Sequence, residues 1–247
     1  MDKLLYVAMS GAKQSFALQS IINHNVANAS TTGFRADLFA AQSRPIPGTG
    51  FPTRVNPLAT SNGWSSAVGA QEATGRELDV AIRGPGYIAV LGRDGTEAYT
   101  RAGDLQTNAD GQLVTSGGHP VLGQQGPITL PNSTHVAIGS DGTISVVAQG
   151  QGPEAISTVD RIKLVNPSPA SLSKGSDGLL RTSDGTTAEA DASVQIVPGS
   201  IEASNVNLAD SMMNMILIAR RYETQVKLMS VANDNAAATT RLVSSSS

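Results

Sequence analysis

Apolar residues recur at helical spacing over residues 1–27 of the chain. On a helical wheel they occupy one half, whereas Lys3, Lys13 and His24 lie on the other half, which is typical of an amphipathic helix. We expect this helix to end near Asn28, before a turn in which Gly33 takes the left-handed backbone conformation. The stripe residues that we take as candidate interface positions are Leu5, Ala8, Ala12, Phe16, Ile22 and Val26.

A second apolar stripe near the C-terminus follows an alternating three–four step, the spacing of a coiled-coil heptad. We expect its helix to begin near Asn207, with Asn207 or Asn205 as the N-cap. Since a lone amphipathic helix leaves its apolar face in water, the two stripes predict helices that pack on each other or on copies of the chain, as in a protein that polymerises. The candidate interface residues here are Met212, Met215, Ala219, Tyr222, Val226 and Met229, and the same step continues through Asn233, Ala236, Thr240 and Val243.

Between the two helices the pattern changes to the period of a β-strand. Leu78, Val80 and Ile82 alternate with Asp79 and other residues, which predicts a half-buried strand. Asp-Gly pairs then recur beside short apolar runs, and Asp-Gly suits two-residue hairpin turns. The pairs begin at Asp94, Asp110, Asp141, Asp177 and Asp184. This repetition predicts an antiparallel β domain.

The predicted fold class is therefore α+β, with a central antiparallel β domain inserted between long terminal helices that pack in a coiled-coil-like inner layer. Residues 1–32 are expected to form the N-terminal helix, and residues 33–77 an extended segment rich in Gly and Pro. Residues 78–197 are expected to form the β-rich outer domain. Residues 198–247 are expected to form the C-terminal connection and helix.

Composition narrows the classes of function. The chain has no cysteine, which excludes disulfides and thiolate metal sites, and its net charge of −3 with 4% aromatic residues does not favour nucleic-acid binding. Its three histidines lack zinc-ligand spacing, and no Gly-x-Ser-x-Gly motif occurs, so we expect no enzyme activity, no metal and no cofactor. No apolar run reaches membrane-spanning length, and residues 1–27 lack the pattern of a cleaved signal peptide. Composition alone would place such a chain in the cytoplasm.

Three motifs together resemble the bacterial flagellar rod and hook protein family. Residues 23–35 resemble its N-terminal signature, residues 78–87 the opening of its central domain, and residues 201–207 the entry into its C-terminal helix. The resemblance extends over nearly the whole chain. The motif residues that carry it are Asn25, Ala27, Asn28, Thr31, Gly33, Phe34, Ser204, Asn205 and Val206.

The resemblance implies a structural subunit of the flagellar basal body that polymerises into the drive shaft between motor and hook. The chain length and the run from Arg220 to Lys227 favour the proximal part of the rod, with the distal part as the alternative. The implied partners are copies of the chain, other proximal and distal rod subunits, and the flagellar type III export apparatus. The implied location is the rod in the periplasm, reached without a cleaved signal peptide. An alternative of another class is a secreted β-rich enzyme or ligand-binding module whose terminal helices pair internally.

Overall fold

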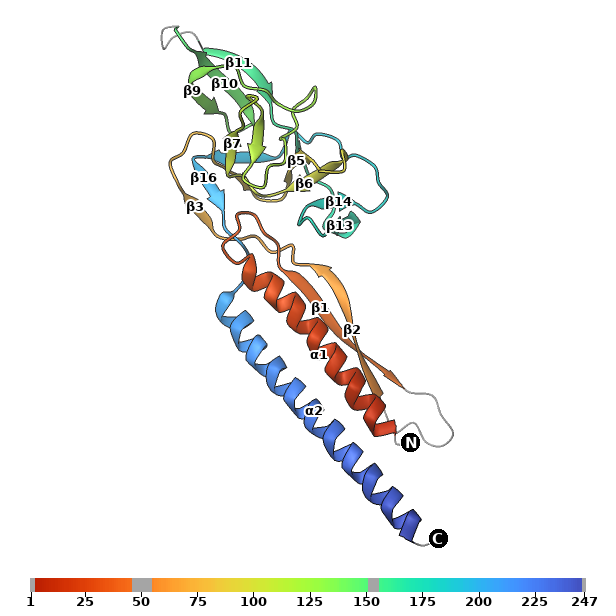
Figure 1. Ribbon diagram of the computed structural model, residues 1–247. Coiled ribbons are helices and arrows are strands. Elements are labelled where there is room, and N and C mark those ends of the chain that lie inside the picture. The colour runs from red at the N-terminus through yellow and green to blue at the C-terminus, as the bar shows by residue number, and fades with distance from the viewer. Residues whose placement is uncertain (1–2, 46–54, 151–155, 246–247) are drawn as a thin grey trace. The chain divides into compact units, whose positions relative to one another are not determined.

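The structure is a computed structural model that describes residues 3–45, 55–150 and 156–245 (Figure 1). The chain forms two compact units. The first, which we call the helical unit, contains residues 1–27, 37–64 and 206–247. The second, the β unit, contains residues 28–36 and 65–205, so the chain passes between the units at four points along its sequence.

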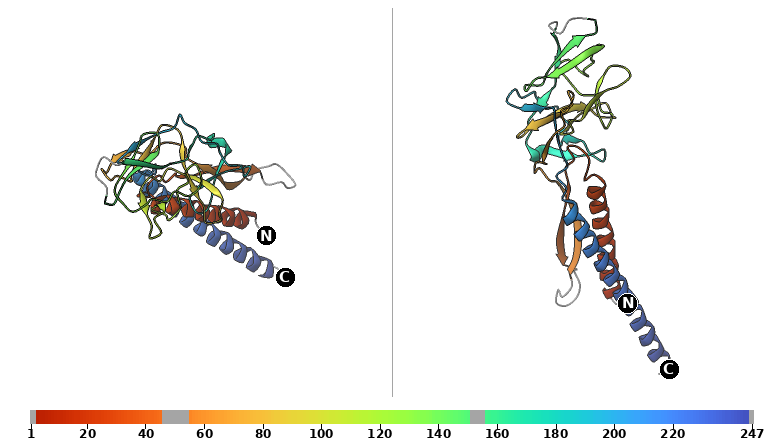
Figure 2. Two further views of the ribbon diagram at one scale, coloured as in Figure 1. Left: turned by 90° about the horizontal axis from the view of Figure 1, so that it is seen from above. Right: turned by 90° about the vertical axis from the view of Figure 1, so that its left-hand side faces the viewer.

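The helical unit contains two long antiparallel helices and a hairpin. Helix α1 (Lys3–Ala27) lies along helix α2 (Leu208–Ser245), and strands β1 (Asp37–Pro45) and β2 (Val55–Trp64) pair and pack on α1 (Figures 1 and 2). Leu18, Ile22 and Ile218 form a small apolar core between the helices. The prediction of long helices at both chain ends that pack together is thus confirmed, and α1 ends one residue before the expected end.

The segment 33–77 contains β1, β2 and β3 (Gln71–Ala73) among its described residues, and residues 46–54 lie outside them. The expected extended backbone is therefore present as a paired hairpin. The domain boundaries drawn from the sequence at residues 33, 78 and 198 remain a prediction.

The β unit consists of short strands whose pairings are all antiparallel over its described residues. Its largest sheet has the order β12-β5-β6-β14-β13, and a second sheet has the order β11-β10-β9. Three further ladders pair β15 with β4, β16 with β3 and β7 with β8. The predicted antiparallel β domain is confirmed. Its elements are β3 (Gln71–Ala73), β4 (Val80–Arg83), β5 (Tyr87–Leu91), β6 (Glu97–Thr100), β7 (Leu105–Thr107), β8 (Leu113–Thr115), β9 (Ser133–Ile138), β10 (Thr143–Ala148), β11 (Ile156–Arg161), β12 (Leu164–Val165), the 3-10 helix η1 (Pro169–Ser171), β13 (Leu172–Lys174), β14 (Leu180–Thr182), β15 (Gln195–Pro198) and β16 (Ser200–Glu202).

Apolar side chains from most of these strands form one core, which explains why such short strands are stable together. Strand β4 lies within this core. The sequence predicted a strand with one buried face, and that prediction is wrong, because Asp79 and Ala81 are buried together with Val80 and Ile82. Asp79 is tolerated there because its carboxylate accepts a hydrogen bond from the Thr74 hydroxyl at 2.6 Å and pairs with Arg76 at 3.4 Å.

Four of the five Asp-Gly pairs form a recurring loop that differs from the expected two-residue turn. Among the described residues every positive φ angle belongs to a glycine, so the type I′ turn, which needs two such residues, is excluded. Instead the Gly92 N–H donates to the Thr96 carbonyl at 2.8 Å, and Gly95 follows with φ of 77°. This is a three-residue loop of a type I turn and a left-handed glycine. The loops at Gly111, Gly142 and Gly178 repeat it.

Candidate assembly interface

The N-terminal stripe divides into two sides in the structure. The side turned into the helical unit contains Ala8, Ala12, Ile22 and Val26, of which the first three are buried and Val26 packs partly buried against Leu18 and Ile22. Leu5 and Phe16 point to solvent, and the Phe16 side chain is 70% exposed. Apolar residues occupy a whole half of the helical wheel, and the wheel does not show which of them face the neighbouring helix. We therefore predicted all of these residues as one interface.

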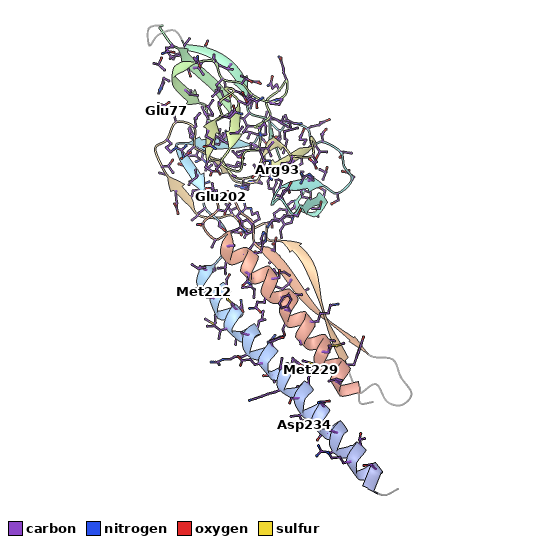
Figure 3. The ribbon with its side chains drawn as sticks, viewed as in Figure 1. Glu77, Arg93, Glu202, Met212, Met229 and Asp234 are labelled. Atoms are coloured by element: carbon purple, nitrogen blue, oxygen red, sulfur yellow. The ribbon has the colours of Figure 1, made fainter. Side chains whose placement is uncertain are left out.

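The C-terminal stripe is divided in the same way. Met215 packs against the core that Leu18 and Ile22 form with Ile218, a residue outside the predicted stripe. Met212, Tyr222 and Val226 are exposed, whereas Ala219 and Met229 are half-buried (Met212 and Met229 are labelled in Figure 3). The buried side of α2 is thus rotated from the predicted stripe towards Ile218 and Ala232. The side chains of Ala236 and Val243 lie outside the described residues.

The helical unit exposes a large amount of apolar surface. All the exposed large hydrophobic side chains of the described residues belong to this unit, except Val68 and Ile156 of the β unit. Each is at least 40% exposed. Those of the helical unit are Leu5, Tyr6, Met9, Phe16, Leu38, Phe39, Leu208, Met212, Met213, Ile216, Leu217, Tyr222, Val226, Leu228 and Val231.

A groove of about 480 Å³ lies between the two helices. Its residues are Gly11, Gln14, Ser15 and Leu18 of α1 and Leu217, Arg220, Arg221, Thr224 and Gln225 of α2. At Gly11 the helices approach so closely that an added Cβ would lie 3.0 Å from the Gln225 side chain. The Gln14 Oε1 atom is buried there and accepts no hydrogen bond from any described residue. The groove thus combines polar side chains with apolar surface, and Gln14 lacks a donor among the described residues.

The motif glycine Gly33 adopts the predicted left-handed conformation, with φ of 67°. Its N–H donates to the Glu202 carbonyl at 2.7 Å. A Cβ at this position would lie 2.2 Å from backbone atoms of both Arg101 and Ala102. Glycine is required here for its backbone conformation and also for the close approach of another chain segment.

A buried cluster of charges joins three distant parts of the β unit, and we call it the ion cluster. The Glu202 carboxylate is fully buried and pairs with Arg35 at 2.8 Å and Arg101 at 2.7 Å. It also accepts from the Gly69 N–H at 2.9 Å. The Arg101 guanidinium donates in addition to carbonyls of β4 and of the following turn. Burial lowers the pKa of Arg35, and the nearby Glu202 carboxylate opposes that shift.

Sequence reasoning assigned no role to Arg35, Arg101 or Glu202. The available signal was a charged residue within an otherwise apolar or small-residue motif, such as Glu202 between Ile201 and Ala203. The lysine Lys174 adds to the cluster, since its ammonium lies 3.9 Å from the centre of the Phe34 ring and donates to the Arg35 carbonyl at 2.7 Å. The motif residue Phe34 is buried beside it.

The side chains of the motif asparagines form hydrogen bonds with backbone N–H and carbonyl groups of other segments. In the β unit, Asn205 accepts from the Ala36 N–H at 2.7 Å and donates to the carbonyl of Ala67 at 2.8 Å, so it is not the N-cap of α2. The cap is Asn207, whose Oδ1 accepts from the Asp210 N–H at 3.2 Å.

In the helical unit, the Asn25 side chain bonds both the N–H and the carbonyl of Asp37, at 2.8 and 3.0 Å. Directly after α1, in the β unit, the Thr31 hydroxyl donates to the Asn28 side chain at 3.2 Å. The remaining motif residues flank these contacts: Ala27 ends α1, and the half-buried Ser204 and Val206 lead into α2.

The described side chains include no group of three His, Asp or Glu placed to hold a metal ion. Within the same residues, neither helix is apolar over a stretch long enough to cross a membrane. The arrangement offers contact surfaces rather than reacting groups.

Three family profiles match successive parts of the chain. Residues 5–35 match the flagella basal body rod protein family, and residues 81–146 match the D1 domain of the flagellar hook protein FlgE/F/G family. Residues 197–242 match the C-terminal part of the flagellar basal body rod FlgEFG proteins.

Individual proteins are similar over the full length. The chain is 40% identical to the flagellar basal-body rod protein FlgF of Escherichia coli over 252 residues, which cover 100% of both chains. It is 39% identical to FlgF of Salmonella typhimurium, again over 100% of both. It is 32% identical to the flagellar basal-body rod protein FlgG of Buchnera aphidicola subsp. Schizaphis graminum, over 93% of this chain and 95% of that one.

Proposed function

The chain belongs to the flagellar basal-body rod protein family, and we propose that it forms the proximal part of the rod. Members of this family are structural, so the chain acts by assembling with rod subunits and not by catalysis. The proximal position is proposed because FlgF, the proximal rod subunit, of Escherichia coli and Salmonella typhimurium matches the chain at 40% and 39% identity, whereas the FlgG protein described above matches it at 32%.

The exposed apolar surface of the helical unit is the observation that supports assembly most strongly. Its exposed large hydrophobic side chains offer an area on the order of 1,000 Å², and a stable interface buries about 800 Å² on each partner. The β unit exposes only Val68 and Ile156 among the described large hydrophobic residues. We infer that the helices supply the contacts between subunits and that the β unit forms an outer layer.

Assembly through the helices suits a shaft that transmits torque. Each subunit would bury the same apolar surface between long helices. Because this contact repeats in every subunit, the assembled shaft would resist twisting. We propose as neighbours copies of this chain and other proximal and distal rod subunits. We also propose export through the flagellar type III apparatus without a cleaved signal peptide, with assembly in the periplasm.

The test is incorporation of a surface variant into basal bodies. Phe16→Asp changes a side chain that is 70% exposed, so the isolated subunit should fold normally by circular dichroism. In the assembled rod it would place a charge in an apolar contact, and we expect incorporation and motility to fall at least tenfold. The matched control is Thr187→Asp, an exposed polar position of the β unit, which the proposal places outside the contacts between helices. Normal incorporation of Phe16→Asp would contradict the proposal.

A further inference from the structure

The five Asp-Gly pairs of the β unit share one backbone contact. In each pair the glycine N–H donates to the carbonyl of the residue three positions earlier, at 3.0 or 3.1 Å. The backbone therefore holds all five glycine amides in the same way. The pairs differ in the partners of the aspartate side chain, and one pair differs from the other four.

Four of the aspartate carboxylates are held by hydrogen bonds from the residue that follows the glycine. At Asp94, for example, the N–H and the hydroxyl of Thr96 donate at 3.1 and 2.8 Å. Hydrogen bonds lower the pKa of all four carboxyl groups, with Arg181 as the main donor at Asp177. The four aspartates held in this way are Asp94, Asp141, Asp177 and Asp184.

The exposed side chain of Asp110 is the exception. Among the described residues no donor reaches its carboxylate. The Gln112 N–H, which corresponds to the Thr96 N–H of the first loop, donates instead to the Asn108 Oδ1 atom at 2.9 Å. The same oxygen also accepts from the Asp110 N–H at 2.9 Å. Asn108 thus takes the donor that would otherwise hold the Asp110 carboxylate.

The first residue of the loop explains this difference. The three other loops with the same backbone begin at Gly92, Gly139 and Gly175, where a Cβ would lie 2.5, 2.8 and 2.6 Å from an aspartate carboxylate oxygen. The missing side chain therefore leaves room for the carboxylate to fold over the turn. The loop of Asp110 begins with Asn108, whose side chain fills that space and accepts the hydrogen bond in place of the carboxylate.

We propose that Asp110 is the site at which this chain isomerises to isoaspartate, and that the other four Asp-Gly pairs are protected by the bonds to their carboxylates. The Gly111 nitrogen attacks Cγ of the protonated Asp110 carboxyl group. The N–Cγ bond forms and the Cγ–OH bond breaks, so that the hydroxyl leaves with the amide proton as water. Water then opens the succinimide ring. Cleavage between the ring nitrogen and the main-chain carbonyl carbon of Asp110 gives isoaspartate, whereas cleavage at Cγ restores aspartate.

A bonded carboxylate is protected for two reasons. Its Cγ is directed towards the donor beyond the glycine, so this bond must break before Cγ reaches the glycine nitrogen. A lowered pKa also keeps the group ionised, and only the protonated acid readily loses water. The glycine itself offers no steric protection, because it has no side chain beside the attacking nitrogen.

Isomerisation at Asp110 would also disturb the core of the β unit. Isoaspartate lengthens the main chain by a methylene group next to Gly111, whose carbonyl accepts from the N–H of the buried Leu130 at 2.7 Å. The modified chain should therefore melt at a lower temperature than the unmodified chain.

The test is to map isoaspartate in the purified full chain. The chain is kept at neutral pH for several weeks and digested, and the peptides are sequenced by electron-transfer mass spectrometry, which distinguishes isoaspartate from aspartate. We expect isoaspartate at Asp110 to be at least fivefold more abundant than at any of the other four aspartates. Isoaspartate formed from Asn62, which also precedes a glycine, is assigned separately by its position.

A double variant tests the cause at Asp110. Asn108→Gly together with Gln112→Thr gives this loop the pattern Gly-x-Asp-Gly-Thr of residues 92–96. It should lower isoaspartate at Asp110 at least fivefold. The matched control is Ala109→Ser, which changes an exposed neighbour and leaves the carboxylate without a donor from the turn, so the amount should stay the same within about twofold.

The converse variant is Gly139→Ala, which places a Cβ 2.8 Å from the Asp141 carboxylate and should raise isoaspartate at Asp141 at least threefold. Circular dichroism establishes that each variant is folded. Equal isoaspartate at Asp110 and at the other four aspartates of the unchanged chain would overturn the inference. An unchanged amount at Asp110 in the folded double variant, or at Asp141 in Gly139→Ala, would overturn the assigned protection.

Discussion

Replacing Gly33 by alanine should destabilise the β unit far more than a glycine replacement in an ordinary turn. The substitution adds one methyl group at a backbone φ of 67°, where an L-residue is strained. It also directs that methyl group at the backbone of Arg101 and Ala102, with a separation of 2.2 Å. Because backbone atoms cannot rotate away, the two chain segments must separate.

The magnitude follows from three contributions. The left-handed conformation costs an L-residue about 1–2 kcal/mol. Separation of the segments weakens the 2.7 Å hydrogen bond from the Gly33 N–H to the Glu202 carbonyl, a loss of about 0.5–1.5 kcal/mol. Residual overlap with the backbone adds to both, so we expect a total of about 3 kcal/mol in the free energy of unfolding, which is high for one methyl group.

The matched control is Gly95→Ala. Gly95 has a similar φ of 77°, and a Cβ there meets no atom within 4 Å. It therefore reports the backbone strain alone, about 1–2 kcal/mol. Urea unfolding of the two variants, monitored by far-UV circular dichroism at equal protein concentration, gives the comparison. If the two substitutions cost the same within about 0.5 kcal/mol, the close approach to Arg101 and Ala102 would not explain the glycine.

Three further predictions concern the ion cluster, the exposed side of α2 and the loops. Glu202→Gln leaves two buried guanidinium groups without their carboxylate and should cost about 3–5 kcal/mol in urea unfolding, whereas the exposed Glu72→Gln should cost less than about 0.5 kcal/mol. Val226→Asp should abolish incorporation into basal bodies and leave the melting temperature of the purified chain unchanged; a large drop in that temperature would instead assign Val226 to the interior. Hydrogen bonds from Thr143 lower the pKa of Asp141, so its stabilising effect is present above the ordinary aspartate pKa and is lost as pH falls through the lower native value. Asp141→Asn should therefore lower the melting temperature at pH 7 and lower it progressively less as pH falls below the ordinary aspartate pKa, and an equal loss throughout would contradict this cause.

The helices and the β domain could be predicted from the sequence because their signals are local. The heptad step at Met215 and Met229, and the run of Asp-Gly pairs, depend only on neighbouring residues. The left-handed Gly33 was predicted for the same reason. The choice of Asn207 over Asn205 as N-cap needed the structure, because Asn205 bonds to residues that are distant in sequence.

The remaining features depend on contacts between distant residues. Glu202 is recognisable as important only when Arg35 and Arg101 are placed beside it, and the sequence separates all three widely. The two sides of the terminal stripes differ for a similar reason, since the exposure of Phe16 and Val226 is decided by where the other helix lies. The loop type at Asp94 is local but is not specified by the Asp-Gly pair alone, because it also involves Thr96, whose N–H donates to the Asp94 carboxylate at 3.1 Å.

A cryo-electron microscopy reconstruction of the basal body from the bacterium that makes this chain tests the central claim most directly. We expect this chain in the proximal part of the rod. We also expect α1 and α2 of each copy to form the inner layer, with Phe16, Met212 and Val226 buried against neighbouring subunits. A reconstruction in which these side chains remain exposed to solvent, or in which the β unit supplies the principal contacts between subunits, would contradict this expectation.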